Sequence, residues 1–272
     1  MTSGKGFHIF ASGYTHPGRK RGSNEDSFLI ANLSEGVRFE RNSTMKFHSG
    51  PLGTLFAVAD GMGGAAAGEM ASRLGVRRLY YEVQELVREV RHPGDSELQQ
   101  ILVEAVGMAN RRIYETARSD SELAGMGTTL TAVLEMSGRL VIGQVGDSRA
   151  YLLRDEGIRQ LTRDQSLVGQ RVSSGELTEE EARRHPQRNI LLQALGVRPS
   201  VELALLSAVG RPGDVLLLCS DGLHSQMSSG EIYEVVAGSN GPQDACEELV
   251  ALANDRGGPD NITALLIQFQ LQ

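Results

Sequence analysis

Hydrophobic positions along the chain of 272 residues fall into short apolar runs and longer stretches with helical spacing. The short runs are rich in Val, Ile, Leu and Thr, and each is bounded by Gly, Asp, Ser or Pro, as strands usually are. They predict strands at 7–11, 26–31, 53–59, 128–136, 139–146, 150–153, 201–209, 214–219 and 261–269. So many strands require two sheets or one very large sheet.

Helical spacing dominates between residues 59 and 127. The apolar positions over 70–90 predict one helix and those over 97–117 predict a second, with the sequence H-P-G-D at 92–95 separating them. Because strands come in runs and helices in pairs, the pattern indicates the α+β class, with helices over the outer faces of stacked antiparallel sheets. Two further helices are predicted near 229–237 and 242–254.

Two polar segments interrupt this pattern. Residues 162–200 contain an acidic run at 179–181 and a basic pair at 183–184, and we expect a mobile excursion from the core, where recognition often resides. Residues 34–51 predict a polar loop or a hairpin excursion. Since no repeat, linker or low-complexity tract divides the chain, we expect a single domain over residues 7–270.

Composition narrows the class of protein. The chain has 27 Lys and Arg against 34 Asp and Glu, a net charge of −7, which is the wrong sign for binding nucleic-acid backbones. Cys219 and Cys246 lie in an apolar run and a helical pattern, which excludes a disulfide scaffold and favours a reducing compartment. No signal-peptide core opens the chain, and no uncharged apolar stretch reaches the ~18 residues of a membrane span. We expect a cytoplasmic protein without a membrane or nucleic-acid partner, and a monomer because no exposed apolar stripe is evident.

Four aspartates stand at the ends of predicted strands: Asp60, Asp147 and Asp221 follow apolar runs, and Asp260 precedes the last one. A single aspartate there is explained by turn formation. Turn formation does not explain four such aspartates together. The strand ends of packed sheets converge, so these carboxylates would repel one another unless cations lay between them. Carboxylates without Cys or His partners suit Mg²⁺ or Mn²⁺ rather than Zn²⁺, and the six histidines lack metal-binding spacing, which favours surface or loop roles for them.

Two loops adjoin these aspartates. The sequence D-G-M-G-G-A-A-A-G-E begins at Asp60, where Gly61 could turn its carbonyl onto a cation; a nucleotide-binding reading is weak because the loop has neither Gly-Lys-Ser/Thr nor G-x-G-x-x-G. Residues 19–27 are either a solvated charged loop or a site in which an arginine grips a phosphate while Glu25 and Asp26 reach a metal shell.

Six motifs occur in an order that resembles metal-dependent protein phosphatases of the 2C class, the PPM family: R-G-S-N-E-D, V-A-D-G-M-G-G, G-M-G-T-T-L, G-D-S-R, S-D-G-L and G-G-P-D-N-I-T. The resemblance covers residues 10 to 269, and D-G-M-G-G is similar to the bacterial branch. It implies a four-layer α-β-β-α sandwich with a flap. It also implies hydrolysis of phosphoserine and phosphothreonine in proteins by a water that bridges two Mn²⁺ or Mg²⁺ ions, opposing a serine/threonine kinase.

The same resemblance implies a role for each motif residue. Asp60 would bridge both cations, Gly61 would give its carbonyl to one, and Asp221 and Asp260 would complete the other. Asp26 and Glu25 would bind the metal ions mainly through water, and Arg21 would bind the substrate phosphate.

A third ion is implied at Asp147 and Asp221, with Asp164 as a weaker ligand, and residues 164–200 correspond to the flap beside the active site. Three positions depart from the family pattern: Met62 and Gln165 stand where histidine is common, and His16 stands where aspartate is common. A pseudophosphatase that binds phosphoproteins without turnover is therefore the alternative, although Asp60, Asp221 and Asp260 are all present.

Overall fold

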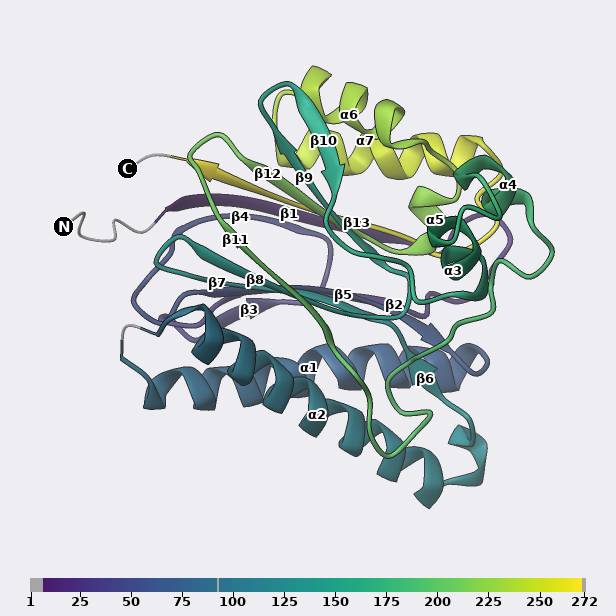
Figure 1. The fold of residues 1–272 in the computed structure, drawn as a ribbon, viewed down its shortest axis with the longest axis horizontal. Helices are drawn as coiled ribbons and strands as arrows, with labels where there is room; N and C mark the ends of the chain where they lie inside the picture. The colour runs from purple at the N-terminus through teal and green to yellow at the C-terminus, as the bar shows by residue number, and fades with distance from the viewer. Residues whose placement is uncertain (1–6, 92, 271–272) are drawn as a thin grey trace.

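Two antiparallel sheets stack face to face in the computed structural model, which describes residues 7–91 and 93–270 (Figure 1). One sheet has the order β10(Gly157–Gln160), β9(Arg149–Arg154), β12(Val215–Cys219), β13(Ile262–Gln270), β1(His8–His16), β4(Ser43–His48). The other has the order β11(Ala204–Val209), β8(Arg139–Val145), β7(Leu130–Met136), β5(Thr54–Met62), β2(Asp26–Asn32), β3(Val37–Phe39), and the short β6(Gly127–Thr128) pairs with the end of β5.

The space between the sheets holds one apolar core. Alternate residues of each strand point inward, so that Phe28 and Phe56 of one sheet meet Leu265 and Phe269 of the other, all fully buried. A side chain at Gly13 of β1 would clash with the ring of Phe28. Glycine there lets the two sheets approach closely.

Helix pairs cover both outer faces. α1(Ala65–Glu89) and α2(Asp95–Ser119) pack on the second sheet, and α6(Ser229–Gly238) and α7(Pro242–Asp255) pack on the first (Figure 1). Each pair buries an apolar stripe against its sheet. The predicted α+β class and four-layer α-β-β-α sandwich are confirmed. Two short helices follow longer elements: η1(Ser121–Leu123) comes after α2, and α5(Asp221–His224) comes after β12.

Several element predictions need correction. Residues 34–51 form neither a loop nor a hairpin: they contain β3 and β4, which join different sheets, because β3 pairs with β2 and β4 pairs with β1. These strands and β10 were missed because edge strands are short and carry polar residues. The predicted strand at 128–136 is divided into β6 and β7 at Thr129. Residue 92, in the predicted break between α1 and α2, lies outside the described residues.

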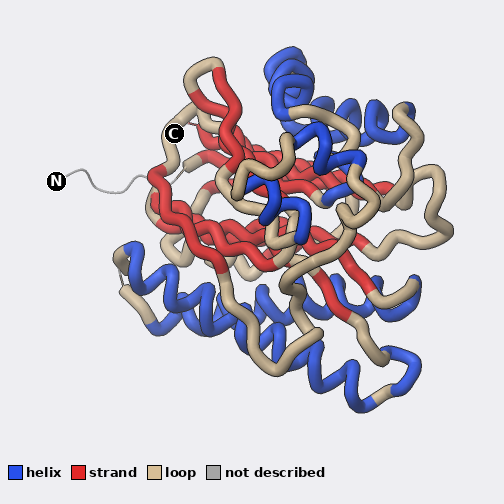
Figure 2. Tube along the Cα trace, turned by 45° about the vertical axis from the view of Figure 1, so that its right-hand side comes forward, coloured by secondary structure: helices blue, strands red, loops and turns tan. Residues whose placement is uncertain are grey.

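The excursion over 162–200 is folded, with α3(Leu167–Ser173) and α4(Glu179–Arg184) (Figure 2). Its acidic run forms the first turn of α4 and its basic pair the last turn, so both charges are favourable to the helix dipole. Thr178 and Glu181 form a capping box at the N-terminus of α4. Its return path is tied to β6 through reciprocal backbone hydrogen bonds of Leu195 and Thr128, at 2.8 and 3.1 Å. Residues 164–200 of this segment are called the flap below.

The cysteines and the helix lengths bear on the expectations from composition. Cys219 and Cys246 are both buried and unpaired, which agrees with the absence of a disulfide scaffold. Among the helices of residues 7–91 and 93–270, none is long and apolar enough to cross a membrane.

Candidate metal centre

Carboxylates from several strand ends meet at one end of the sandwich. Asp26 begins β2 and Asp60 lies near the end of β5, directly opposite each other in the strand register. Asp221 follows β12, and Asp260 precedes β13. A cleft of about 290 Å³, called the metal cleft below, is lined by the expected residues Arg21, Glu25, Asp60, Gly61, Asp147, Asp221 and Asp260. Asp26 does not line it and is buried.

The backbone of Asp60 is held on both sides. Its N–H donates to Thr129 Oγ1 at 2.9 Å, and its carbonyl accepts from the Thr129 N–H at 2.8 Å and from Thr128 Oγ1 at 2.9 Å. Thr129 Oγ1 also lies 2.6 Å from Ser148 Oγ, in the turn that follows Asp147. Because other residues satisfy its backbone groups, the carboxylate of Asp60 is left for the cleft.

Glycines allow the chain to pass close to this point. The N–H of Gly61 donates to the Glu25 carbonyl at 3.1 Å, and a side chain at Gly61 would clash with the carbonyl of Gly68. Gly63 and Gly64 have φ of +115° and +93°, which favour glycine. Gly61 is therefore explained by close backbone packing beside Asp60, and Gly63 and Gly64 by their positive φ.

Buried carboxylate oxygens without partners mark the site. Asp26 Oδ2 accepts from Ser220 Oγ and Thr263 Oγ1, both at 2.7 Å, while Asp26 Oδ1 has no partner. Burial raises the pKa of Asp26 to about 7, although these two hydroxyl groups oppose the shift. Ser220 and Thr263 were not singled out in the sequence, where only their places in S-D-G-L and G-G-P-D-N-I-T signal them.

Asp60 and Asp221 both line the metal cleft, and Asp221 Oδ1 is buried without a partner. Burial and the charge of Asp260 raise the pKa of Asp221 to about 6. Burial and the charges of Asp26 and Asp221 raise the pKa of Asp60 well above its ordinary value. Such a cluster needs protons or cations, and its all-oxygen donors fit a hard divalent cation.

Side chains alone do not give a divalent cation a complete set of ligands at this site. Within the described residues, no three Asp, Glu, His or Cys side chains gather closely enough to form a complete ligand set. In addition, Arg21 Nη2 binds Asp260 Oδ2 at 2.7 Å, so that oxygen is already paired with a cation of the protein. Mg²⁺ commonly keeps several waters and few protein ligands, so the carboxylates and the Gly61 carbonyl suffice for such an ion.

The loop that carries Arg21 is anchored by Asn261, which sequence reasoning did not assign. Asn261 Nδ2 donates to the carbonyls of Pro17 and Ser23 at 2.9 and 2.8 Å, and its Oδ1 accepts from the Glu25 N–H at 2.8 Å. Asn261 thus fixes the Arg21 loop and Glu25 relative to the adjacent Asp260. Its place in the G-G-P-D-N-I-T motif was the available signal.

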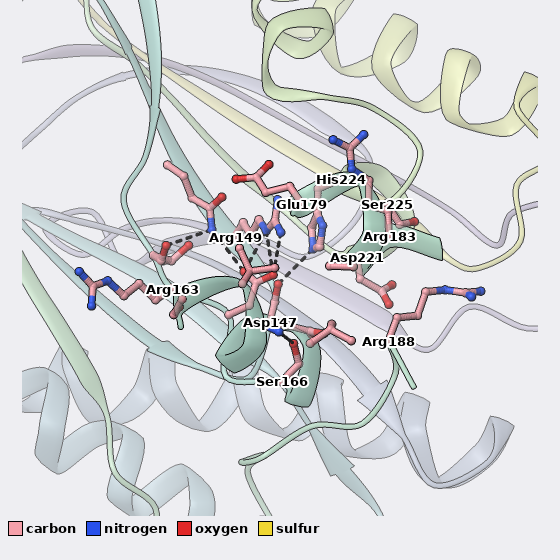
Figure 3. A pocket seen from close by; sticks show the side chains of 18 of the residues that line it. Asp147, Arg149, Arg163, Ser166, Glu179, Arg183, Arg188, Asp221, His224 and Ser225 are labelled. Atoms are coloured by element: carbon pink, nitrogen blue, oxygen red, sulfur yellow. Dashed lines mark hydrogen bonds and ion pairs between the residues drawn. The ribbon is translucent and has the colours of Figure 1, made fainter. Parts of the chain in front are cut away.

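A second pocket, of about 250 Å³, lies under the flap and shares Asp147, Asn189 and Asp221 with the metal cleft (Figure 3). Asp164 lines this pocket, where its carboxylate pairs with the guanidinium group of Arg149. Arg149 Nε and Nη2 donate to its two oxygens at 2.9 and 2.7 Å. Burial opposes ionisation of Asp164, yet the bonds and charge of Arg149 prevail and lower its pKa. The structure therefore places Asp164 beside the metal cleft without bringing it into the lining.

His224 corrects the expectation of surface or loop roles for all histidines. It is buried in α5, and Figure 3 shows its ring directed at Asp147, whose carbonyl oxygen lies 3.1 Å from Nε2. Burial and the nearby Arg149 lower the pKa of His224 to about 3, so the neutral ring donates to this carbonyl. His8 and His48 are also not in loops, since they pair across β1 and β4.

Gln165, a departure from the family pattern, ties the flap to the turn of Asp147. Its Oε1 accepts from the Gly146 N–H at 2.9 Å, and its own N–H donates to the Gly146 carbonyl at 2.9 Å. Its carbonyl accepts from the Leu192 N–H of the flap at 2.8 Å. Met62, the other departure, ends β5 and lines the metal cleft.

Comparisons with known proteins agree with this geometry. The family model for protein phosphatase 2C matches residues 44–258. The serine/threonine phosphatase stp of Listeria innocua is 39% identical over 217 residues, which cover 80% of this chain and 85% of that protein. The solved serine/threonine phosphatase of S. agalactiae is 35% identical, with a TM-score of 0.81 and coverage of 96% of this chain and 99% of that one.

A second solved structure bears on the metals. The catalytic domain of the serine/threonine protein phosphatase PstP, in complex with two manganese ions, is 34% identical, with a TM-score of 0.79 and coverage of 97% of this chain and 100% of that one. The resemblance found in the sequence motifs is thus confirmed over most of the chain. The chain belongs to the protein phosphatase 2C family, in its bacterial branch, and is a protein phosphatase.

Proposed function

We propose that this chain hydrolyses phosphoserine and phosphothreonine in proteins and opposes a serine/threonine kinase. The observation that carries the proposal is the pair of buried, unpartnered oxygens, Asp26 Oδ1 and Asp221 Oδ1, beside the metal cleft. The names of its relatives, serine/threonine phosphatases in Listeria innocua and S. agalactiae, support the substrate class.

We assign two Mn²⁺ or Mg²⁺ ions to the metal cleft. Asp60 would contribute to both, Gly61 would supply its carbonyl to one, and Asp221 and Asp260 would hold the other. Asp26 and Glu25 would act mainly through water. When bound, two such cations lower the pKa of a shared water and offset charge on the phosphoryl oxygens. Family membership and the two manganese ions of the PstP structure support this dependence on metals.

Arg21 binds the substrate phosphate in this proposal. Its side chain is about half exposed at the cleft and pairs with Asp260 at 2.7 Å. A phosphate that enters the cleft is a stronger acceptor for the guanidinium group, and the exchange frees Asp260. Asn261 keeps Arg21 within reach of both partners through the loop that it anchors.

A third ion is assigned to Asp147 and Asp221, at the wall shared by the metal cleft and the pocket under the flap. Asp164 is the weaker ligand, since Arg149 occupies both of its oxygens. We further propose one catalytic domain over residues 7–270, with its flap at 164–200, acting as a monomer in the cytoplasm without a nucleic-acid or membrane partner.

Phosphate release from a phosphothreonine peptide tests the proposal, first with Mn²⁺ and then with the metal chelated. Turnover that requires Mn²⁺ is expected. A protein that binds the phosphopeptide and Mn²⁺ but releases no phosphate would instead be the pseudophosphatase considered from the sequence. Retained turnover after complete chelation would contradict the metal assignment.

A further inference from the structure

A third, smaller hollow of about 150 Å³ adjoins the metal cleft. Its apolar lining consists of Met62, Leu191, Leu192, Ala194, Val197 and Val201. Met62 and Leu191 also line the metal cleft, so the two hollows share a wall. Arg198 is the one charged residue of the lining, and no carboxylate belongs to it.

Two residues of the lining, Met62 and Val197, pack against Gly127 of β6. Gly127 pairs with Met62 of β5. A Cβ atom at Gly127 would lie 2.9 Å from Val197 Cγ2 and 3.5 Å from Met62 Cγ. The absence of a side chain at Gly127 therefore lets Val197 approach β6 closely.

The loop that carries Val197 is held in place from both directions. Asn110, buried in α2, accepts from the Gly196 N–H at 2.8 Å through Oδ1. Its Nδ2 donates to the carbonyl of Arg198 at 3.1 Å. Val197 lies between these two anchored residues. The hollow is therefore formed before any ligand binds.

The rim of the hollow exposes large apolar side chains. Leu192 is 45% exposed and Val197 is 48% exposed. Covering them with another apolar group is favourable, because it removes apolar surface from water. A basic occupant would find no carboxylate in the lining and would face Arg198. At about 30 Å³ per liquid water, the hollow holds about five waters, a volume suited to one aliphatic side chain.

We infer that this hollow is a substrate subsite for an apolar side chain, such as Leu, Ile, Val or Met, near the phosphorylated residue of the protein substrate. The inference rests on the proposed function, because the phosphoryl group must lie in the metal cleft. A substrate chain that crosses the wall of Met62 and Leu191 brings a neighbouring residue over the hollow. At about 3.3 Å per residue of extended chain, that neighbour lies within about three positions of the phosphoresidue.

The test uses two kinds of substrate. Phosphothreonine peptides in a Gly/Ser background carry Leu at each of the three positions on either side, with Asp, Lys and Gly as comparisons. p-Nitrophenyl phosphate, which has no flanking residues, reports the metal cleft alone. At one of these positions, Leu is expected to raise kcat/KM about tenfold over Gly, mainly by lowering KM. A small apolar pocket supplies an effect of this size.

Two variants place a charge in the hollow without touching the metal cleft lining: Val197→Asp and Leu192→Asp. Each is expected to abolish the preference for Leu while p-nitrophenyl phosphate is hydrolysed as before. Val103→Asp is the matched control, because Val103 is 39% exposed on α2, outside this lining. It should keep the preference.

A wild-type enzyme that hydrolyses p-nitrophenyl phosphate but has no positional preference for Leu would overturn the subsite alone. So would a preference that survives in both Asp variants. A protein that hydrolyses neither p-nitrophenyl phosphate nor any peptide with Mn²⁺ would overturn the proposed function, and the subsite with it.

Discussion

Asp26 and Asp60 are directly paired residues of the antiparallel strands β2 and β5. Side chains of such a pair lie on the same face of the sheet, about 4.5–5.5 Å apart at Cβ, and like charges there are destabilising. Asp26 is buried, Asp60 lines the metal cleft, and the charge of Asp26 helps to raise the pKa of Asp60. The sheet thus holds two acids together at a cost in stability that cations would offset.

Asp60→Asn should abolish activity without unfolding the protein. The change removes one charge from the cluster and keeps the volume, so kcat is expected to fall by roughly 100-fold or more. In the metal-free protein it relieves repulsion with Asp26 and Asp221, so the melting temperature should equal or exceed that of the wild type. Phosphate release and thermal melting check the two outcomes, and near-normal turnover would contradict the assignment of Asp60.

Arg21→Ala should raise KM for a phosphopeptide by about 10- to 100-fold, the loss expected for a hydrogen bond to a charged group. Arg21→Lys should restore only part of it, because Lys lacks the planar fork. Steady-state kinetics with a phosphothreonine peptide measures the change. Unchanged KM in both variants would mean that Arg21 is no more than the partner of Asp260.

Asp164→Ala should destabilise the protein by about 3 kcal/mol. The change leaves Arg149 buried with no carboxylate partner, which is the costly way to break a buried ion pair. Denaturant unfolding of the Mn²⁺-loaded protein gives the difference. Unchanged stability in this variant would show that the ion pair between Arg149 and Asp164 does not stabilise the fold.

Glu135 supplies a test by pH, away from the metal cleft. Burial raises its pKa above the ordinary value of 4.5, although Ser49, Gly138 and Thr54 donate hydrogen bonds to it. A carboxyl group with a raised pKa in the folded state stabilises fully below its unfolded pKa, and that contribution is lost as pH rises through the folded pKa. Wild type should therefore lose more stability than Glu135→Gln between pH 5 and pH 8.

Melting temperatures of both proteins across that range, in Mn²⁺, provide the measurement. Other titrating groups are common to the two proteins, so the difference isolates Glu135. Parallel curves would show that its pKa is not raised.

The sandwich followed from the sequence because its strands are long, apolar and bounded by turn residues. The short edge strands did not, since β3, β4 and β10 carry polar side chains and gain their pairing from neighbouring strands. Asp60, Asp221 and Asp260 were found because each ends or precedes an apolar run. Asn261, Ser220 and Thr263 act through contacts with residues far away in the chain, which spacing does not reveal.

Histidine and charge patterns were less informative. His224 was expected at the surface or in a loop because the histidines lack metal-binding spacing, yet tertiary packing buries it against Asp147. The position of Asp164 suggested a metal ligand, and only the fold shows that Arg149 engages it.

The central claim is that the buried carboxylates form a metal centre. Calorimetric titration of the metal-free protein with Mn²⁺ tests it most directly, comparing wild type with Asp60→Asn and with the control Asp95→Asn, whose carboxylate is exposed on α2. Wild type and the control should bind at least two ions, and Asp60→Asn should lose tight binding. Absence of Mn²⁺ binding to the wild type, or equal binding to all three proteins, would contradict the account.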